Sequence, residues 1–322
     1  MIEGKTSRFD VVCLGLIVAD QVCAPIRKIP APGGLITSPS LQLAIGGCAA
    51  NASTDLATLG LSVALVGCLG NDPLGEFVLR ELQANGVNCD HVCISESQQT
   101  AATMVINVEH EDRRFIHAVG ANTELTGQEV ADELLSRSKV IAVGGFGLNP
   151  QLSGSNVRTL FSRAKELGVA TVLDVVLDDV QLCRNMLQEA LPVTDFFLPN
   201  CDEARLLTNA TSPEEQITSF HDQGAETVII TAGSQGCTLG TSGQETFHLP
   251  AFEVEQIDGT GGGDAFLSGF LYGLLRQHSL RECLIYGSAM GASCVKHAGA
   301  TTGVFNAEQL ENFVASHRPI WN

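Results

Sequence analysis

From residue 139 onward, short apolar runs alternate with longer stretches in which apolar residues recur every three or four positions. The short runs have the length of buried strands, and the longer stretches have the period of amphipathic helices. Such alternation predicts a parallel sheet covered by helices on both faces. The predicted strands are residues 139–143, 169–175, 195–198 and 227–231, and the predicted helices are residues 151–167, 180–189, 201–207 and 213–223.

The rest of the chain follows a less regular pattern. Helix-ending glycines follow two N-terminal helical stretches, and a broad apolar stripe marks the first C-terminal helix. The β-type runs are residues 9–18, which end near Asp20, then 35–45 and 62–69, with strand-like runs from 232 to 254 and at 252–257. The remaining predicted helices are 49–59, 74–84, 263–276, 280–297 and 307–316.

Residues 101–119 depart from the βα pattern. Two short β-rich runs, 102–108 and 113–119, are joined by the charged turn 109–112, which is typical of an antiparallel, partly solvated hairpin. Together with the N-terminal β-type runs, this hairpin predicts a small separate sheet. We therefore expect one α/β domain over residues 1–322, with a small sheet built from about 16–45 and 100–120.

Composition narrows the function classes. The chain has 322 residues, 44% of them hydrophobic and 17% charged, which excludes disorder as its main state. Its net charge of −18 argues against a nucleic-acid-binding surface and against docking on anionic lipid. An anionic nucleotide can still bind where backbone amides and a metal ion neutralise its phosphates.

Cysteine usage and hydropathy indicate the compartment. The eleven cysteines include no Cys-x-x-Cys pair, so they are typical of buried thiols in a reducing compartment and disfavour a zinc site. No window reaches about 18 uninterrupted apolar residues, and no cleavage site follows the first apolar run. We expect a cytoplasmic protein with no membrane partner.

The most informative stretch is DGTGGGD at residues 258–264, which opens a predicted helix. First-turn amides lack internal partners, the helix dipole adds partial positive charge, and glycines allow close approach of an anion. Gly261, Gly262 and Gly263 therefore predict an anion hole, and Asp264 is placed to accept a proton from an attacking hydroxyl. The alternative is a flexible turn with a capping acid. The stretch is neither a Walker A loop nor a dinucleotide fingerprint.

The DGTGGGD stretch resembles the C-terminal signature of ribokinase-like (PfkB-type) carbohydrate kinases. GGCAANAS at residues 46–53 is similar to their N-terminal signature, and the two motifs stand in the family's order. The resemblance extends over about residues 9–304. It implies a ribokinase-like fold, with a central mostly parallel sheet, helices on both faces and the small sheet as a lid. It also implies a kinase that uses ATP and Mg²⁺.

The resemblance implies a role for several residues of this chain. Asp264 matches the catalytic base, and the amides of residues 261–263 match the anion hole. The substrate-binding positions are Asp20, Gly46, Gly47 and Asn51. The nucleotide-side positions are Asn200, Glu203, Thr231, Gly233 and Gly236. Glu203 would organise Mg²⁺ through water, although Asn200 to Glu203 alone also has the pattern of a helix capping box.

Two positions concern positive charge in the site, one as a missing lysine and one as a candidate metal-ion site. Cys48 stands where several members carry Lys, including many that phosphorylate sugar phosphates, which weakens a phosphosugar interpretation. A monovalent-cation site, such as one for K⁺, near Asp258 and the loop 299–303 is compatible with the resemblance.

Three functions remain open on the sequence. The first is an ATP-dependent kinase of a small carbohydrate. The second is a nucleoside kinase, which would stack a base on aromatic side chains; Phe115 and Phe146 are the candidates, because the single tryptophan, Trp321, is next to the C-terminus. The third is a non-catalytic sugar-binding regulator, which would have no need of Asp264. An exposed lid sheet would also favour a homodimer through its edge strands.

Overall fold

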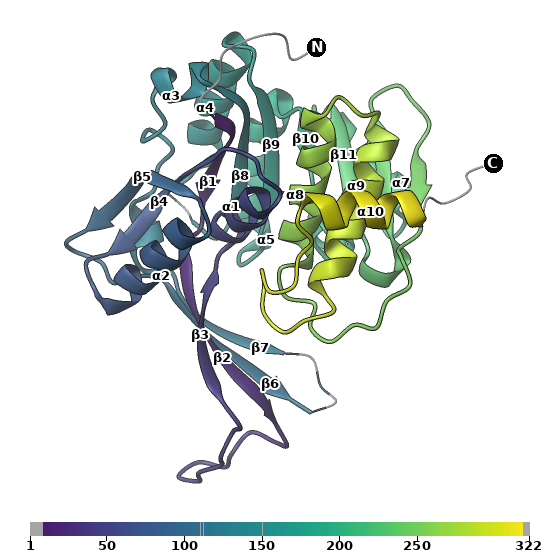
Figure 1. The fold of residues 1–322 in the computed structure, drawn as a ribbon. Coiled ribbons are helices and arrows are strands. Elements are labelled where there is room, and N and C mark those ends of the chain that lie inside the picture. Colours follow the sequence, from purple (N-terminus) through teal and green to yellow (C-terminus); the bar gives the residue numbers. More distant parts are fainter. Residues whose placement is uncertain (1–8, 110, 112, 150, 318–322) are drawn as a thin grey trace.

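The computed structural model describes residues 9–109, 111, 113–149 and 151–317 (Figure 1). The outer ends of the expected domain, Trp321 and two residues of the charged turn at 109–112 lie outside the described residues. No helix within these ranges is long and apolar enough to cross a membrane.

A nine-stranded sheet forms the centre of the molecule, in the order β13-β12-β11-β10-β9-β8-β1-β4-β5. All neighbouring strands are parallel except at the β11–β12 and β12–β13 pairs, which are antiparallel. The strands are β1 Phe9–Gly15, β4 Val63–Gly70, β5 Asn88–Ser95, β8 Ser138–Phe146, β9 Ala170–Val175, β10 Phe196–Phe197, β11 Thr227–Thr231, β12 Cys237–Thr241 and β13 Phe247–Leu249. The prediction of a mostly parallel sheet with helices on both faces is confirmed.

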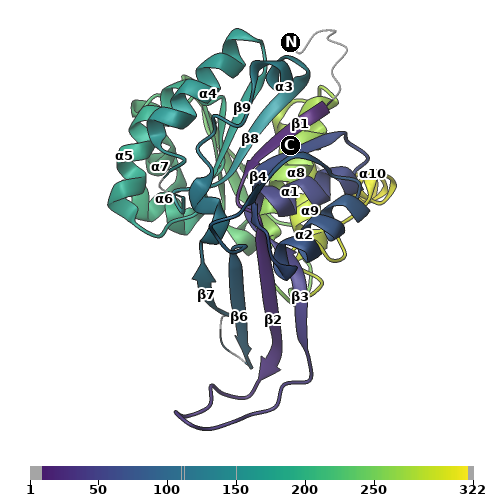
Figure 2. The same cartoon turned by 90° about the vertical axis from the view of Figure 1, so that its left-hand side faces the viewer.

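Helices cover the two faces of this sheet, as Figures 1 and 2 show. One face carries α1 Cys48–Thr58, α2 Pro73–Ala84, α8 Gly262–Leu275, α9 Leu280–Cys294 and α10 Ala307–Ser316. The other carries α3 Asp132–Ser136, α4 Gly154–Glu166, α5 Val180–Ala190, α6 Cys201–Thr208 and α7 Pro213–Asp222. Three short 3-10 turns are η1 Gly120–Glu124, η2 Leu191–Val193 and η3 Gly233–Gln235.

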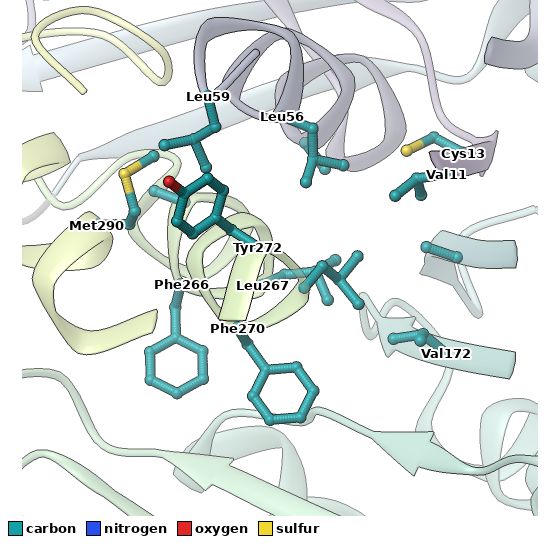
Figure 3. Close-up of a cluster of buried hydrophobic side chains, with 14 of the residues drawn as sticks. Val11, Cys13, Leu56, Leu59, Val172, Phe266, Leu267, Phe270, Tyr272 and Met290 are labelled. Carbon is teal, nitrogen blue, oxygen red and sulfur yellow. The ribbon is translucent and has the colours of Figure 1, made fainter. Parts of the chain in front are cut away.

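Strand residues alternate between two hydrophobic cores. Val11 and Cys13 of β1 pack on the α1 and α8 side, whereas Val12 and Leu14 pack on the opposite side. Figure 3 shows part of the first core, to which α8 contributes Phe270 and Tyr272 and the sheet contributes Val11. Burial on both faces explains why these strands are continuous apolar runs rather than alternating ones.

A second, four-stranded sheet extends from one end of the molecule in the order β3-β2-β6-β7 (Figure 2). Its strands are β2 Val18–Ile26, β3 Leu41–Gly46, β6 Ala102–Val108 and β7 Arg114–Ala118. The β6–β7 pair is the antiparallel hairpin that the sequence predicts. We call these four strands the small sheet.

The structure corrects the prediction of one β run over residues 9–18. The run breaks after Gly15, and Asp20 is the third residue of β2 in the small sheet rather than the end of the first strand. Gly15 has φ +147°, and a Cβ there would lie 2.0 Å from the carbonyl oxygen of Gly144. The close approach of β8 therefore requires a glycine at the break.

Two further expectations differ from the structure. Residues 252–257 form no strand, because Phe252 packs edge-on against Phe313 of α10 instead of joining the sheet. The edge strand β5, Asn88–Ser95, is absent from the predicted elements. Its polar and half-exposed residues weaken the pattern of a buried strand.

Candidate active site

The candidate base and a candidate substrate-binding residue meet where the starts of α1 and α8 face each other. Asn51 of α1 donates a hydrogen bond from Nδ2 to Oδ2 of Asp264 in the first turn of α8, at 2.8 Å. The two residues are 213 positions apart in the sequence. The site lies near β1 and β8, where the strand order reverses and open α/β sheets bind ligands at the carboxyl ends of the strands.

The glycine run forms the start of α8. Gly261 is the N-cap in a left-handed conformation, φ +76°, and a Cβ there would lie 2.2 Å from the carbonyl oxygen of Ala300. A Cβ on Gly263 would meet no atom within 4 Å. Gly261 is therefore required by the backbone, whereas Gly263 leaves open space beside the first-turn amides.

Burial sets the electrostatics of Asp264. It raises the pKa of this carboxyl to about 6, while hydrogen bonds from Asn51 and Cys48 act in the opposite direction and the charge of Asp20 adds to the rise. At neutral pH the group is ionised, with a proton affinity higher than that of an ordinary Asp.

Asp174 and Cys48 complete an acidic cluster around Asp264. One ligand atom from each of the three side chains lies within 4.8 Å of the others. Burial, with the charges of Asp264 and Glu203, raises the pKa of Asp174 well above its usual range, although it accepts a hydrogen bond from the Gly145 amide. Asp174 is missing from the sequence-based candidates, but its place near the end of a buried parallel strand is a usable signal.

Asp20 reaches the site from the small sheet. A Cβ on Gly46 would lie 2.1 Å from the Asp20 carboxylate, so this glycine lets the carboxylate lie against the backbone of β3. Gly47 has φ +91° and is the N-cap of α1. Burial raises the pKa of Asp20 to about 6, with an opposing hydrogen bond from Thr103.

The nucleotide-side candidates gather at the ends of β10 and β11. Asn200 and Thr231 form a parallel bridge, Gly233 is the first residue of the short turn η3, and Gly236 is its C-cap. Asn200 and Glu203 also form the capping box of α6, because the Asn200 amide donates to Oε2 of Glu203 at 2.8 Å. Asn200 and Glu203 therefore do cap the helix, as their pattern predicts. The capping hydrogen bond uses Oε2 of Glu203 and does not involve Oε1.

The charge of Glu203 interacts with that of Asp264, the candidate base. Burial raises the pKa of Glu203 to about 7, and the charges of Asp202 and Asp264 contribute in the same direction. Carboxylate and amide oxygens are the donors that Mg²⁺ prefers, directly or through water. Asn200 and Glu203 offer such oxygens, and neither Glu203 nor Asp174 has a basic ion-pair partner among the described residues. The donor chemistry of these residues therefore suits Mg²⁺.

Asp258 has its own set of donors. Thr260 donates from both its amide and its hydroxyl to Oδ1, and the Gly299 amide donates to Oδ2 at 3.0 Å. Arg113, from the small-sheet end of the molecule, lies 3.7 Å from the same carboxylate. These donors and this cation hold the pKa of Asp258 below its usual range despite burial. The contact also connects the hairpin with the glycine run.

The two aromatic candidates differ in position. Phe146 is fully buried in the core and presents no face to a ligand. Phe115 is half exposed on β7, on the same face of the small sheet as Asp20. Three further polar groups were not among the sequence candidates: Thr103 and His117 in the small sheet, and the buried Asp55 in α1.

Comparisons with known proteins show the family and the fold of the chain. The family model for the pfkB family carbohydrate kinases matches residues 8–306. A ribokinase of Haemophilus influenzae is 29% identical over 95% of this chain and 99% of its own length. The structure of Arabidopsis thaliana ribokinase with ribose and ATP has a TM-score of 0.83 at 23% identity, covering 95% of this chain and 98% of that one. An E. coli protein with ATP and Mg²⁺ has a TM-score of 0.79 at 24% identity, covering 96% and 100%.

The fold is ribokinase-like, and the protein is a phosphotransferase that acts on an alcohol group. More particularly, the chain belongs to the pfkB family of carbohydrate kinases, as its two motifs predict.

Proposed function

We propose that this protein transfers the γ-phosphoryl group of ATP to a hydroxyl of a small neutral carbohydrate. The observation that carries the proposal is the Asn51–Asp264 hydrogen bond at the start of α8, because it joins a substrate-binding candidate to the candidate base beside the glycine run. The acids around Asp264 and the neutral Cys48 disfavour a phosphorylated acceptor.

In the proposed reaction, the acceptor hydroxyl lies between Asp20, Asn51 and Asp264. Its oxygen bonds to the γ-phosphorus as the bond from that phosphorus to the bridging oxygen of ADP breaks. Asp264 takes the hydroxyl proton, and the amides of residues 261–263 stabilise the charge on the transferred group. No covalent enzyme intermediate is needed, since in-line transfer relies on positioning and charge stabilisation.

The cofactor roles follow from the donor groups. Asn200 and Glu203 would hold Mg²⁺ through water, and the bound ion would neutralise charge on the phosphates of ATP. Thr231, Gly233 and Gly236 would form the nucleotide-side loop. A K⁺ site at Asp258 would have to share the carboxylate with Arg113 and the existing amide donors, so K⁺ dependence needs its own measurement.

The small sheet would act as a lid within a single domain of residues 1–322, and excluding water would limit ATP hydrolysis. The face of the small sheet that exposes Leu43, Met104 and Ile116 would pair with a second copy to form a homodimer. We also propose that the protein works in the cytoplasm, which its eleven free cysteines support.

A nucleoside kinase is the second candidate, favoured by Phe115. This ring is half exposed on the same face of the small sheet as Asp20, where it could stack on a base. A non-catalytic regulator has less support, because a binding protein has no need of Asp264.

ADP release from Mg-ATP tests these functions. The panel holds ribose, fructose, 2-keto-3-deoxygluconate, fructose 6-phosphate, adenosine and other ribonucleosides, each with and without K⁺. We expect a neutral sugar to respond and fructose 6-phosphate to fail. A response to nucleosides alone would favour the second candidate, and silence across the panel with intact ATP binding would favour the regulator.

A further inference from the structure

Three polar side chains form one row across the small sheet. Asp20 of β2 lies opposite Thr103 of β6, and Thr103 lies opposite His117 of β7. Residues directly opposite each other on neighbouring strands point to the same face of a sheet. His117 therefore shares the face of Asp20, the candidate substrate-binding acid. The adjacent row, Gln21, Met104 and Ile116, points to the other face.

Hydrogen bonds connect the row and define which atoms donate. Oγ1 of Thr103 lies 3.0 Å from Nδ1 of His117, and on its other side Thr103 is paired with Asp20, whose pKa its hydroxyl lowers by hydrogen bonding. A carboxylate can only accept, and a hydroxyl has one hydrogen. When the Thr103 hydroxyl donates its hydrogen to Asp20, Nδ1–H of His117 is the donor to Thr103.

This assignment leaves Nε2 of His117 as an acceptor. Burial lowers the pKa of His117, opposed by the charge of Asp178, so the ring is neutral at pH 7. In a neutral ring with its proton on Nδ1, Nε2 carries a lone pair. That atom is buried and has no hydrogen-bond partner among the described residues. A buried acceptor without a donor is costly, so a ligand that supplies one binds more tightly.

We propose that His117 is a specificity-determining residue, whose Nε2 accepts a hydrogen bond from a hydroxyl of the acceptor sugar. The proposal rests on the carbohydrate kinase function above and extends it. The acceptor carries a second hydroxyl that points to the small sheet, apart from the one that is phosphorylated. Thr103 acts as a positioning residue, because it holds both the Asp20 carboxylate and the tautomer of His117.

Two variants separate contact with the sugar from support of Asp20. The side-chain amide of His117→Asn takes the place of Nδ1 and can still donate to Thr103, but nothing replaces Nε2. The longer amide of His117→Gln reaches the place of Nε2. With D-ribose, or the sugar that responds best in the panel, we expect His117→Asn to raise the acceptor KM about tenfold. The KM for ATP and kcat should change little, and His117→Gln should recover part of the loss.

Monodeoxy analogues of the same sugar identify the hydroxyl. One analogue should have about a tenfold higher KM with the wild-type enzyme and no further increase with His117→Asn, because both changes remove the same hydrogen bond. If, for every analogue, the increase in KM from the missing hydroxyl and the increase from His117→Asn multiply, the proposed contact is wrong. A wild-type acceptor KM in His117→Asn, with unchanged thermal unfolding and ATP binding, would overturn it as well.

A spectroscopic readout does not depend on turnover. Nitrogen-15 NMR of histidine-labelled protein should show His117 protonated on Nδ1 and bare on Nε2, with Thr103→Val weakening that preference and Thr103→Ser keeping it. Titration with the panel sugars should move the Nε2 resonance. If that resonance does not move with any sugar, the His117 proposal is wrong. If it moves but no sugar is phosphorylated, the kinase function fails while the contact stands.

Discussion

Asp264 differs from Asp202, another acid in the first turn of a helix, because it is partly buried and faces a second helix. Asp202, in the first turn of α6, has 72% of its side chain exposed and pairs with Arg205. Asp264 instead accepts from Asn51 and has Asp174 and Cys48 beside it. Its environment suits proton transfer, whereas that of Asp202 suits capping.

The first prediction concerns the base. Asp264→Asn keeps the shape and a hydrogen-bonding group beside Asn51 but removes the proton acceptor. We expect turnover to fall about 10²–10⁴-fold, the usual contribution of a general base, with ATP affinity nearly unchanged. Steady-state kinetics and ATP titration check this, and Asp202→Asn is the matched control. Near wild-type turnover in Asp264→Asn would end the assignment.

The second prediction concerns pH. The base works only when ionised, and burial raises the pKa of Asp264 to about 6. The value of kcat/KM for the acceptor should therefore be constant above about pH 7 and fall about tenfold per pH unit below about pH 6. The residual activity of Asp264→Asn should not show this decrease below about pH 6. A wild-type profile that stays level down to pH 5 would contradict the role.

At the scale of elements, helix α1 has two roles. Asn51 and Asp55 are four positions apart and so lie on one side of the helix. Asn51 reaches Asp264, whereas Asp55 is fully buried, and neither of its carboxylate oxygens has a hydrogen-bond partner among the described residues. Burial and the nearby charge of Asp264 raise the pKa of Asp55 well above its usual range.

The third prediction follows from Asp55. The folded protein holds this proton to a higher pH than the unfolded chain, so the free energy of unfolding should fall as pH rises above the ordinary Asp pKa of about 4. Asp55→Asn removes this term, so between pH 5 and 8 its stability should fall less than that of the wild type. Urea unfolding at both pH values measures the difference. Asp222→Asn, at an exposed site, should follow the wild type, and equal slopes for all three proteins would contradict the prediction.

At the scale of the whole molecule, the two faces of the small sheet have different chemistry. The face with Asp20, Thr103 and His117 adjoins the candidate active site. The opposite face exposes large apolar side chains in register across the strands, at Leu43, Met104 and Ile116. Contiguous exposed apolar groups on a sheet favour association with another chain.

The fourth prediction is that this outward face mediates the proposed homodimer. Met104→Lys with Ile116→Lys places two like charges in one row, so the double variant should be monomeric, near 34.0 kDa. Light scattering during size-exclusion chromatography, over a range of concentrations, measures the mass. Leu182→Lys, on the distant helix α5, is the control. A monomeric wild type, or a double variant that still dimerises, would contradict this interface.

Much of the fold and of the candidate site was predictable from local signals. The apolar runs and helical periods from residue 139 onward predict the parallel sheet. The charged turn between two β-rich runs predicts the hairpin. The glycine run marks the start of α8 because an anion site at a helix N-terminus needs only one short segment. The two motifs and their order identify the family.

The break at Gly15, the cluster around Asp174 and the row from Asp20 to His117 needed the tertiary structure. Each depends on contacts between segments far apart in the chain, such as the approach of β8 to Gly15 or the pairing of β2 with β6. The sequence by itself determined most of the helices and strands from residue 139 onward and the family of the chain, because these follow from local period and from short motifs. Only the tertiary structure decided which acids are buried together and which face of the small sheet adjoins them, since burial and register are properties of the packed chain.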